Sequence, residues 1–167
     1  MFKVNDYVVY GLTGVCQIVD IQTDTLINDE ENEFYVLKPV FSDNMTIKIP
    51  VNNYHAKMRK AISKDEVQAL IASMPEQETV WIDDNRERTE SFKGALRTGK
   101  SEEWVRIIKT IYLEKAERVA AGKKLSKADE DIFYAAEKQL YEEFAIALGI
   151  TPDDVVPYII EHIPSDK

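Results

Sequence analysis

The chain has few of the residues from which small enzymes and cross-linked proteins are usually built. Its 167 residues include one cysteine, two histidines and six scattered glycines. The single cysteine, Cys16, argues against a disulfide framework or a thiolate metal site. Neither His55 nor His162 lies in a metal-ligand spacing, and the sequence has no glycine-rich phosphate loop. We therefore expect no cofactor, no metal and no enzymatic activity. A hydrolase or transferase would need His55 to meet carboxylates from elsewhere in the chain.

Long hydrophobic runs are also missing. No window of the sequence approaches the length that crosses a membrane. The first ten residues, MFKVNDYVVY, read as a strand and lack the plan of a signal peptide. The apolar content of 44% is ordinary for a globular protein. We expect a cytoplasmic monomer without a membrane partner.

Positive charge is scarce, but it is unevenly distributed. The net charge is −9, which taken over the whole chain argues against a nucleic-acid partner. Residues 81–127, however, hold 12 lysines and arginines against 8 aspartates and glutamates. Residues 128–167 hold 2 against 10. The basic middle of the chain therefore keeps an anionic partner open at one face.

The first third of the chain has the alternation of β-strands. DYVVYGLTGVCQIVDIQTDTL is rich in β-branched residues, with Gly11 and Gly14 at a tight turn between two strands. In MTIKIP, Thr46 and Lys48 alternate with apolar residues, which places Lys48 on the solvent face. Four or five short antiparallel strands predict a small barrel-like or SH3-like domain over residues 1–60.

From residue 63 onward the apolar period becomes helical. Ser63 with Glu66, and later Ser126, are predicted helix caps. A helix is predicted from about Asp84 to Arg97, and a short one follows Thr151. Two helices between these should bury apolar stripes, which consist of Trp104, Ile107, Ile108, Ile111 and Tyr112 in the first and Phe133, Ala136, Leu140, Phe144 and Leu148 in the second. The fold class is thus α+β, with an all-α domain over residues 61–167.

Trp81 stands in a strongly charged run, TVWIDDNRERTESFKGAL, where a core residue is not expected. A lone tryptophan commonly anchors a linker to a helical core, and an aromatic residue displayed for a partner would stand in the same pattern. The sequence leaves these two interpretations open. Trp104, by contrast, begins an apolar helical stripe and is predicted to lie in the core.

An ordered series of segments resembles the CarD family of bacterial transcription regulators, also called CdnL. The series is FKVNDYVVY, GVCQIVDI, EFYVLK and MTIKIPVNN, then a tryptophan and a helical block ending LSKADEDIFYAAEKQLYEEFA. It extends to about residue 150, and its first part also resembles the polymerase-interacting domain of transcription-repair coupling factors. The resemblance implies a Tudor-like domain that binds the RNA polymerase β subunit. It also implies a helical domain that contacts promoter DNA at the upstream edge of the bubble.

The resemblance also implies roles for particular residues. Trp81 matches a tryptophan that wedges into the distorted minor groove and stabilises the open complex. Helical spacing places Arg86, Lys93 and Arg97 within about 40° of one another, as a candidate phosphate-facing stripe, and leaves Arg88 on the other side as a structural pair. The remaining candidates are Lys123, Lys124 and Lys127 for DNA, and Asp24, Thr25, Thr46 and Lys48 for polymerase. A self-neutralised helix face and an ordinary lysine-rich loop remain the alternatives for the two basic groups.

The chain departs from some relatives at both surfaces. Asp83 and Asp84 follow the tryptophan where some relatives have arginines, and Asp24 stands where some have a basic residue. We therefore expect DNA binding that is weak alone and not sequence-specific, with polymerase supplying the local concentration. The acidic end of the chain supports a rival hypothesis, a protein-only adaptor on polymerase that does not touch DNA.

Overall fold

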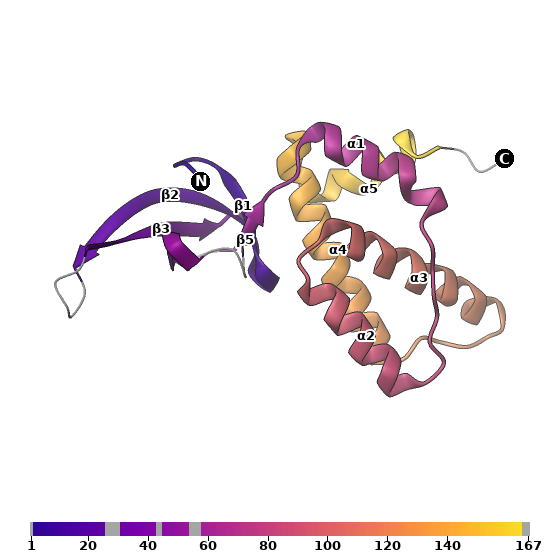
Figure 1. Cartoon of the computed structure of the whole chain (residues 1–167). Helices are drawn as coiled ribbons and strands as arrows, with labels where there is room; N and C mark the ends of the chain where they lie inside the picture. Colours follow the sequence, from indigo (N-terminus) through magenta and orange to yellow (C-terminus); the bar gives the residue numbers. More distant parts are fainter. Residues whose placement is uncertain (1, 26–30, 43–44, 54–57, 165–167) are drawn as a thin grey trace. The chain divides into compact units, whose positions relative to one another are not determined.

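The computed structural model describes residues 2–25, 31–42, 45–53 and 58–164. The chain divides into two compact units, Met1–Ala61 and Ile62–Lys167, each with a core of its own. Figure 1 shows strands in the first unit and helices in the second, as predicted for an α+β chain. Within the described ranges, no helix combines the length and the apolar character that a membrane span requires.

The described part of the first unit forms a five-stranded sheet in which every neighbouring pair is antiparallel. Its order is β4-β3-β2-β1-β5, so that β4 and β5 are the edge strands. A 3₁₀ turn, η1 (Gly11–Thr13), joins the first two strands, and Gly14 after it has a φ of 95°. The strands are β1 (Tyr7–Tyr10), β2 (Gly14–Thr25), β3 (Glu31–Pro39), β4 (Ile47–Pro50) and β5 (Met58–Lys60).

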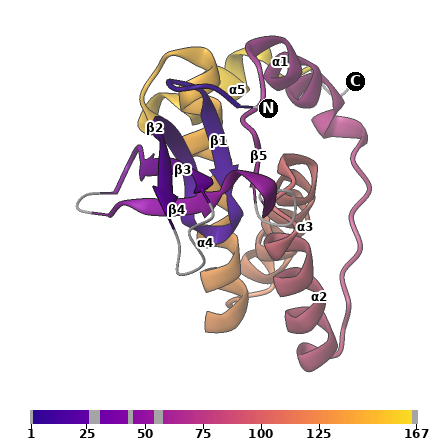
Figure 2. The same cartoon turned by 60° about the vertical axis from the view of Figure 1, so that its left-hand side comes forward.

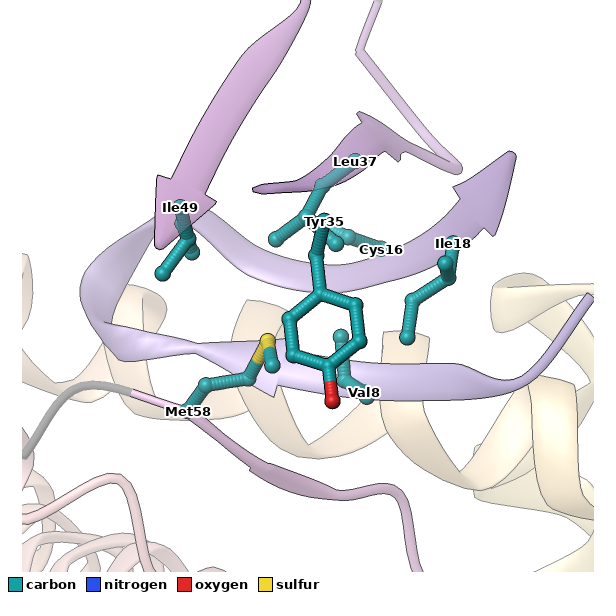
Figure 3. Packing of buried hydrophobic residues seen from close by; sticks show 7 residues of the cluster. All are labelled: Val8, Cys16, Ile18, Tyr35, Leu37, Ile49 and Met58. Atoms are coloured by element: carbon teal, nitrogen blue, oxygen red, sulfur yellow. The ribbon is translucent and has the colours of Figure 1, made fainter. Parts of the chain in front are cut away.

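Side chains from each strand of this sheet meet in one core, which Figure 3 shows around the Tyr35 ring. A register shift in β2 between Ile18 and Asp20 changes which residues point inward: Cys16 and Ile18 before it, Ile21 after it. The bulge therefore lets a long strand keep its apolar residues on the core side as it bends. The sheet is barrel-like in its single core, but no strand pairing among the described residues closes β4 onto β5.

The second unit is all helical. The capping box predicted at Ser63 and Glu66 is present, and Ser126 accepts a hydrogen bond from the Asp129 N–H as an N-cap. Pairs of helices pack α3 on α4, α2 on both, and α1 and α5 on α4, as Figures 1 and 2 show. The elements are α1 (Lys64–Ser73), η3 (Met74–Glu76), α2 (Asn85–Arg97), α3 (Ser101–Ala120), α4 (Lys127–Leu148), η4 (Pro152–Asp154) and α5 (Val155–His162).

The helical core contains most of the predicted apolar residues, but Ile108, Tyr112, Phe133 and Leu148 are not fully buried. Trp104 is fully buried as predicted, but Tyr112 on the same stripe is 62% exposed. In α4, Ile132 is buried in place of its neighbour Phe133, which is only partly buried, as is Leu148 at the end of the helix. The apolar stripe of α3 is wider than the surface that α2 and α4 cover. The uncovered edge of the stripe lines an open apolar groove of about 660 Å³ between α3, α4 and α5.

Candidate functional site

Trp81 lies on an extended segment, residues 77–84, that connects η3 to the start of α2. Figures 1 and 2 both show this segment passing along the helical unit from the end of α1 to the start of α2. Its first part is held by Lys109 of α3, whose ammonium group donates to the carbonyl oxygens of Met74, Pro75 and Gln77 at 2.8 to 3.0 Å. An ammonium group has three donors, so these contacts use all of them.

Arg88 holds the other end of the segment. Its Nε and Nη2 atoms lie 3.0 and 2.9 Å from the two carboxylate oxygens of Asp129 at the start of α4. The remaining donors reach the carbonyl oxygens of Ile82 and Asp83 and the Asn85 side chain. All five N–H groups are therefore used, and Arg88 is 2% exposed. This confirms Arg88 as a structural pair, and it fixes the backbone directly after Trp81.

The Trp81 indole is partly buried. Its buried part anchors the segment to the helical core, and its exposed part is accessible to a partner. Its ring lies 6.3 Å from the Phe92 ring, and the Arg88 guanidinium carbon lies 4.3 Å from its centre. A second guanidinium, that of Arg118, lies 5.5 Å from the ring centre. Cation–π contacts of this kind fix the ring while leaving part of it in solvent.

Arg118 also connects the tryptophan to the lysine loop at residues 121–126. Its Nε donates to Glu114 at 3.1 Å, and its Nη1 donates to the Lys124 carbonyl at 3.4 Å. The loop leaves α3 through a left-handed Gly122, with φ of 74°, and the Lys123 N–H donates to the Arg118 carbonyl. The structure thus brings the lysine loop to the same end of the helical unit as Trp81.

The predicted stripe on α2 is exposed along its length. Arg86, Lys93 and Arg97 are all exposed, whereas Phe92 and Leu96 are buried on the opposite face. The Arg86 side chain is paired with Glu90 at 3.5 Å, as the self-neutralising alternative requires for that one residue. Both groups of that pair are strongly exposed, so their attraction is weak and an anion can compete for Arg86.

The lysine cluster is exposed as well. Lys123 and Lys124 lie in the loop, and Lys127 occupies the first turn of α4, 3.9 Å from Asp131. No hydrogen bond or ion pair between described residues connects this cluster to Lys93 or Arg97. The lysine loop is linked to Trp81 through Arg118, which contacts the Lys124 carbonyl and lies beside the indole.

The predicted polymerase residues lie on β2, on β4 and just before β4. Lys48 is exposed on the edge strand β4, with Thr46 exposed just before it. Strand register places Lys48 beside Val36, which pairs with Asp20, whereas Asp24 pairs with Asn32. Four residues of strand, about 13 Å, therefore separate Asp24 from the position level with Lys48. The side chains of Asp24 and Thr25 lie outside the described part of the structure.

No group of three or more potential metal ligands occurs among the described residues. His55, which an enzyme would need, lies outside them. Cys16 is buried, and desolvation raises the pKa of its thiol to about 11. The thiol is therefore protonated and unreactive at neutral pH, as expected for a core residue.

Comparison with known families bears on the sheet domain, whose described strands all lie within the matched residues. Residues 2–62 match the family model of the CarD-like/TRCF RID domain. The N-terminal unit is similar to the CarD-like/TRCF RID domain, and we refer to it as the RID domain. This confirms the resemblance for that unit; the helical residues lie outside the match, and no curated protein matches the chain. The RID domain is an RNA-polymerase-interacting domain, which implies an interaction of this chain with RNA polymerase.

Asp129 and Arg118 are among the residues of the Trp81 site that were not predicted. Asp129 had only a local signal, its position three residues after the Ser126 cap, and Arg118 had only the four-residue spacing to Glu114. Neither spacing indicates a contact with the Trp81 segment, because that segment comes much earlier in the chain. Only the packing of α2, α3 and α4 brings these groups together.

Proposed function

We propose that the chain is a non-enzymatic regulator of transcription initiation. Its RID domain binds the β subunit of bacterial RNA polymerase, and its helical unit contacts promoter DNA at the upstream edge of the transcription bubble. The contact stabilises the open complex. The match of residues 2–62 to an RNA-polymerase-interacting domain carries the polymerase half of this proposal.

The edge strands of the RID domain support binding by strand addition. β4 pairs on one side only, with β3, and β5 pairs only with β1 in the described structure. Backbone N–H and C=O groups at an open edge can pair with a strand of a partner, and such pairing depends little on side-chain identity. This mode accommodates Asp24 at a position that is basic in some relatives, because the affinity comes mainly from backbone groups. Exposed Lys48 on β4 is the side chain best placed to add charge complementarity.

The surroundings of Trp81 support the DNA half. A partly exposed indole is fixed by Arg88, Arg118 and Phe92, and the lysine loop lies at the same end of the unit. A rigid apolar ring can insert at a distorted base step, and flanking cations hold it against the phosphates. Neither contact requires base-specific hydrogen bonds, so the binding is not sequence-specific. Because few phosphates are neutralised, affinity for DNA alone is weak.

The mechanism is a population shift. A protein that contacts the open complex more than the closed one increases the open population, and the shift is limited to the difference in contact free energy. Polymerase binding by the RID domain makes the DNA contact intramolecular, which compensates for its weakness. Whether output rises or falls then depends on which step limits a promoter.

A second candidate is the protein-only adaptor. It is favoured by the pairing of Arg86 with Glu90 and of Lys127 with Asp131, which partly neutralises both basic groups. The acidic balance of residues 128–167 favours it too. The adaptor requires no contribution from the indole of Trp81 to the open complex, and this separates the two functions experimentally.

The deciding experiment measures the lifetime of the open complex with purified polymerase, in the absence of the protein and with wild type, Trp81→Ala or Tyr112→Ala. Tyr112 is an aromatic residue that is 62% exposed and lines the groove between α3 and α5. We expect wild type and Tyr112→Ala to lengthen the lifetime equally. With Trp81→Ala the increase in lifetime should be about ten-fold smaller, as for loss of an interface hot spot. Equal lifetimes for wild type and a folded Trp81→Ala would favour the adaptor.

A further inference from the structure

Arg118 differs from Arg88, the other guanidinium at Trp81, in how its donors are used. All five N–H groups of Arg88 have acceptors, and its side chain is 3% exposed. Arg118 uses one N–H on Glu114 and one on the Lys124 carbonyl, and its side chain is 31% exposed. Within the described chain, no acceptor is present for its other three N–H groups. Arg88 is therefore a fixed part of the fold, and Arg118 has donors to spare.

The charge on Arg118 is held by a single carboxylate. Glu114 lies one turn earlier on α3 and meets the Nε atom at 3.1 Å. A pair at this spacing contributes only about 0.3–0.5 kcal/mol to helix stability, so a stronger anion can replace it. A phosphate group offers two oxygens to the guanidinium fork, which Glu114 engages through Nε alone. Glu114 therefore only weakly neutralises Arg118, the cation that contacts the Trp81 ring.

We propose that Arg118 is a further phosphate-binding residue of the DNA site, and that Glu114 restrains it until DNA is engaged. The inference rests on the proposed contact of the helical unit with promoter DNA. The ligand is a backbone phosphate next to the base step that receives Trp81. Arg118 keeps its contact with the Lys124 carbonyl and turns its free Nη donors to the phosphate, while Glu114 is released to solvent.

The test removes the charge of Glu114 and leaves Arg118 unchanged. Glu114→Gln keeps the size and the hydrogen-bond acceptor of the side chain but removes its charge. We expect it to lengthen the open-complex lifetime roughly two- to five-fold over wild type, the effect of one additional exposed charge contact. The slope of log lifetime against log salt should become steeper by about one unit, as for one more neutralised phosphate.

Glu103→Gln is the matched control. Glu103 pairs with Arg106 at 3.5 Å on the same helix, and its loss changes the net charge of the protein by the same amount. We expect Glu103→Gln to behave as wild type. Equal lengthening by both variants would show an effect of net charge and would overturn the proposal. The double variant Glu114→Gln with Arg118→Ala should lose the gain.

The remaining outcomes also decide the matter. If Arg118→Ala shortens the lifetime while Glu114→Gln leaves it unchanged, Arg118 only holds the Trp81 ring and the phosphate contact is rejected. Melting temperatures of each variant confirm that the helical unit is folded. If wild type itself has no effect on the lifetime, the proposed function falls and this inference with it. A wild-type effect with equal Glu114→Gln and Glu103→Gln rejects the inference alone.

Discussion

Arg88 and Asp129 form the contact on which the geometry of the Trp81 site depends. The ion pair is bidentate, and both side chains are at most 3% exposed. Asp129→Asn leaves a buried guanidinium without its counter-charge, and we expect a loss of about 3–5 kcal/mol in the free energy of unfolding. Chemical denaturation measures this directly.

Asp131→Asn is the control for that prediction. Asp131 pairs with Lys127 at 3.9 Å, and both side chains are more than 60% exposed. Breaking an exposed pair costs little, so its free energy of unfolding should stay within about 0.5 kcal/mol of wild type. Comparable losses in the two variants would show that the buried pair has no special role in stability.

The buried thiol of Cys16 should make the stability of the RID domain depend on pH. Burial raises the pKa of its thiol from 9.0 to about 11. Between these pH values the thiol of the unfolded chain loses its proton while the thiol of the folded chain keeps it. Deprotonation stabilises the unfolded state, so the free energy of unfolding falls as the pH rises. Below pH 9 the thiol has no such effect. We expect Cys16→Ala to show a smaller loss of stability between pH 9 and 11, measured by chemical denaturation at each pH. A loss equal to that of wild type would contradict the assignment.

At the scale of the element, the end of α3 sets the path of the lysine loop. Gly122 has a φ of 74°, and the Lys123 N–H closes the helix end on the Arg118 carbonyl. An alanine at this position has open space for its Cβ but a disfavoured backbone conformation. We expect Gly122→Ala to cost about 1–2 kcal/mol of stability.

At Gly94, the same substitution to alanine is expected to raise stability rather than lower it. It lies inside α2 at a negative φ, and a Cβ added there meets no atom within 4 Å. Gly94→Ala should therefore stabilise the protein by about 0.5–1 kcal/mol, because alanine favours the helix. Thermal melts of the two variants test both statements. Destabilisation by Gly94→Ala would show that the surface of α2 is more constrained than its open space indicates.

The elements themselves were predictable because their signals are local. Ser63 with Glu66, and Ser126, act on groups three residues away, and both caps are present where the sequence predicts them. The site was less predictable. Arg88 and Asp129 stand 41 positions apart, and no periodicity encodes which two helices will meet. The exposed Tyr112 was misassigned for the same reason, since its stripe shows an apolar face without showing how much of it a neighbour covers.

At the scale of the whole molecule, function is proposed to depend on the covalent connection of two units with separate cores. The RID core draws its residues from positions before 61, and the Trp81 site draws its own from positions after 62. Each unit should therefore fold when produced alone, as residues 1–61 and 62–167, with circular dichroism spectra that sum to that of the full chain.

The separated units should nevertheless fail to act together. In the proposed mechanism, polymerase binding by the full chain places the helical unit at an effective concentration on the order of millimolar near the promoter. At micromolar concentrations, the two fragments mixed with polymerase should give the open-complex lifetime of polymerase alone, while residues 1–61 still bind polymerase. Because the proposed DNA contact is weak by itself, a large excess of residues 62–167 should restore part of the lifetime. Trp81→Ala in that fragment should abolish the restoration. Full activity from equimolar fragments would instead show that the helical unit finds the complex without the RID domain.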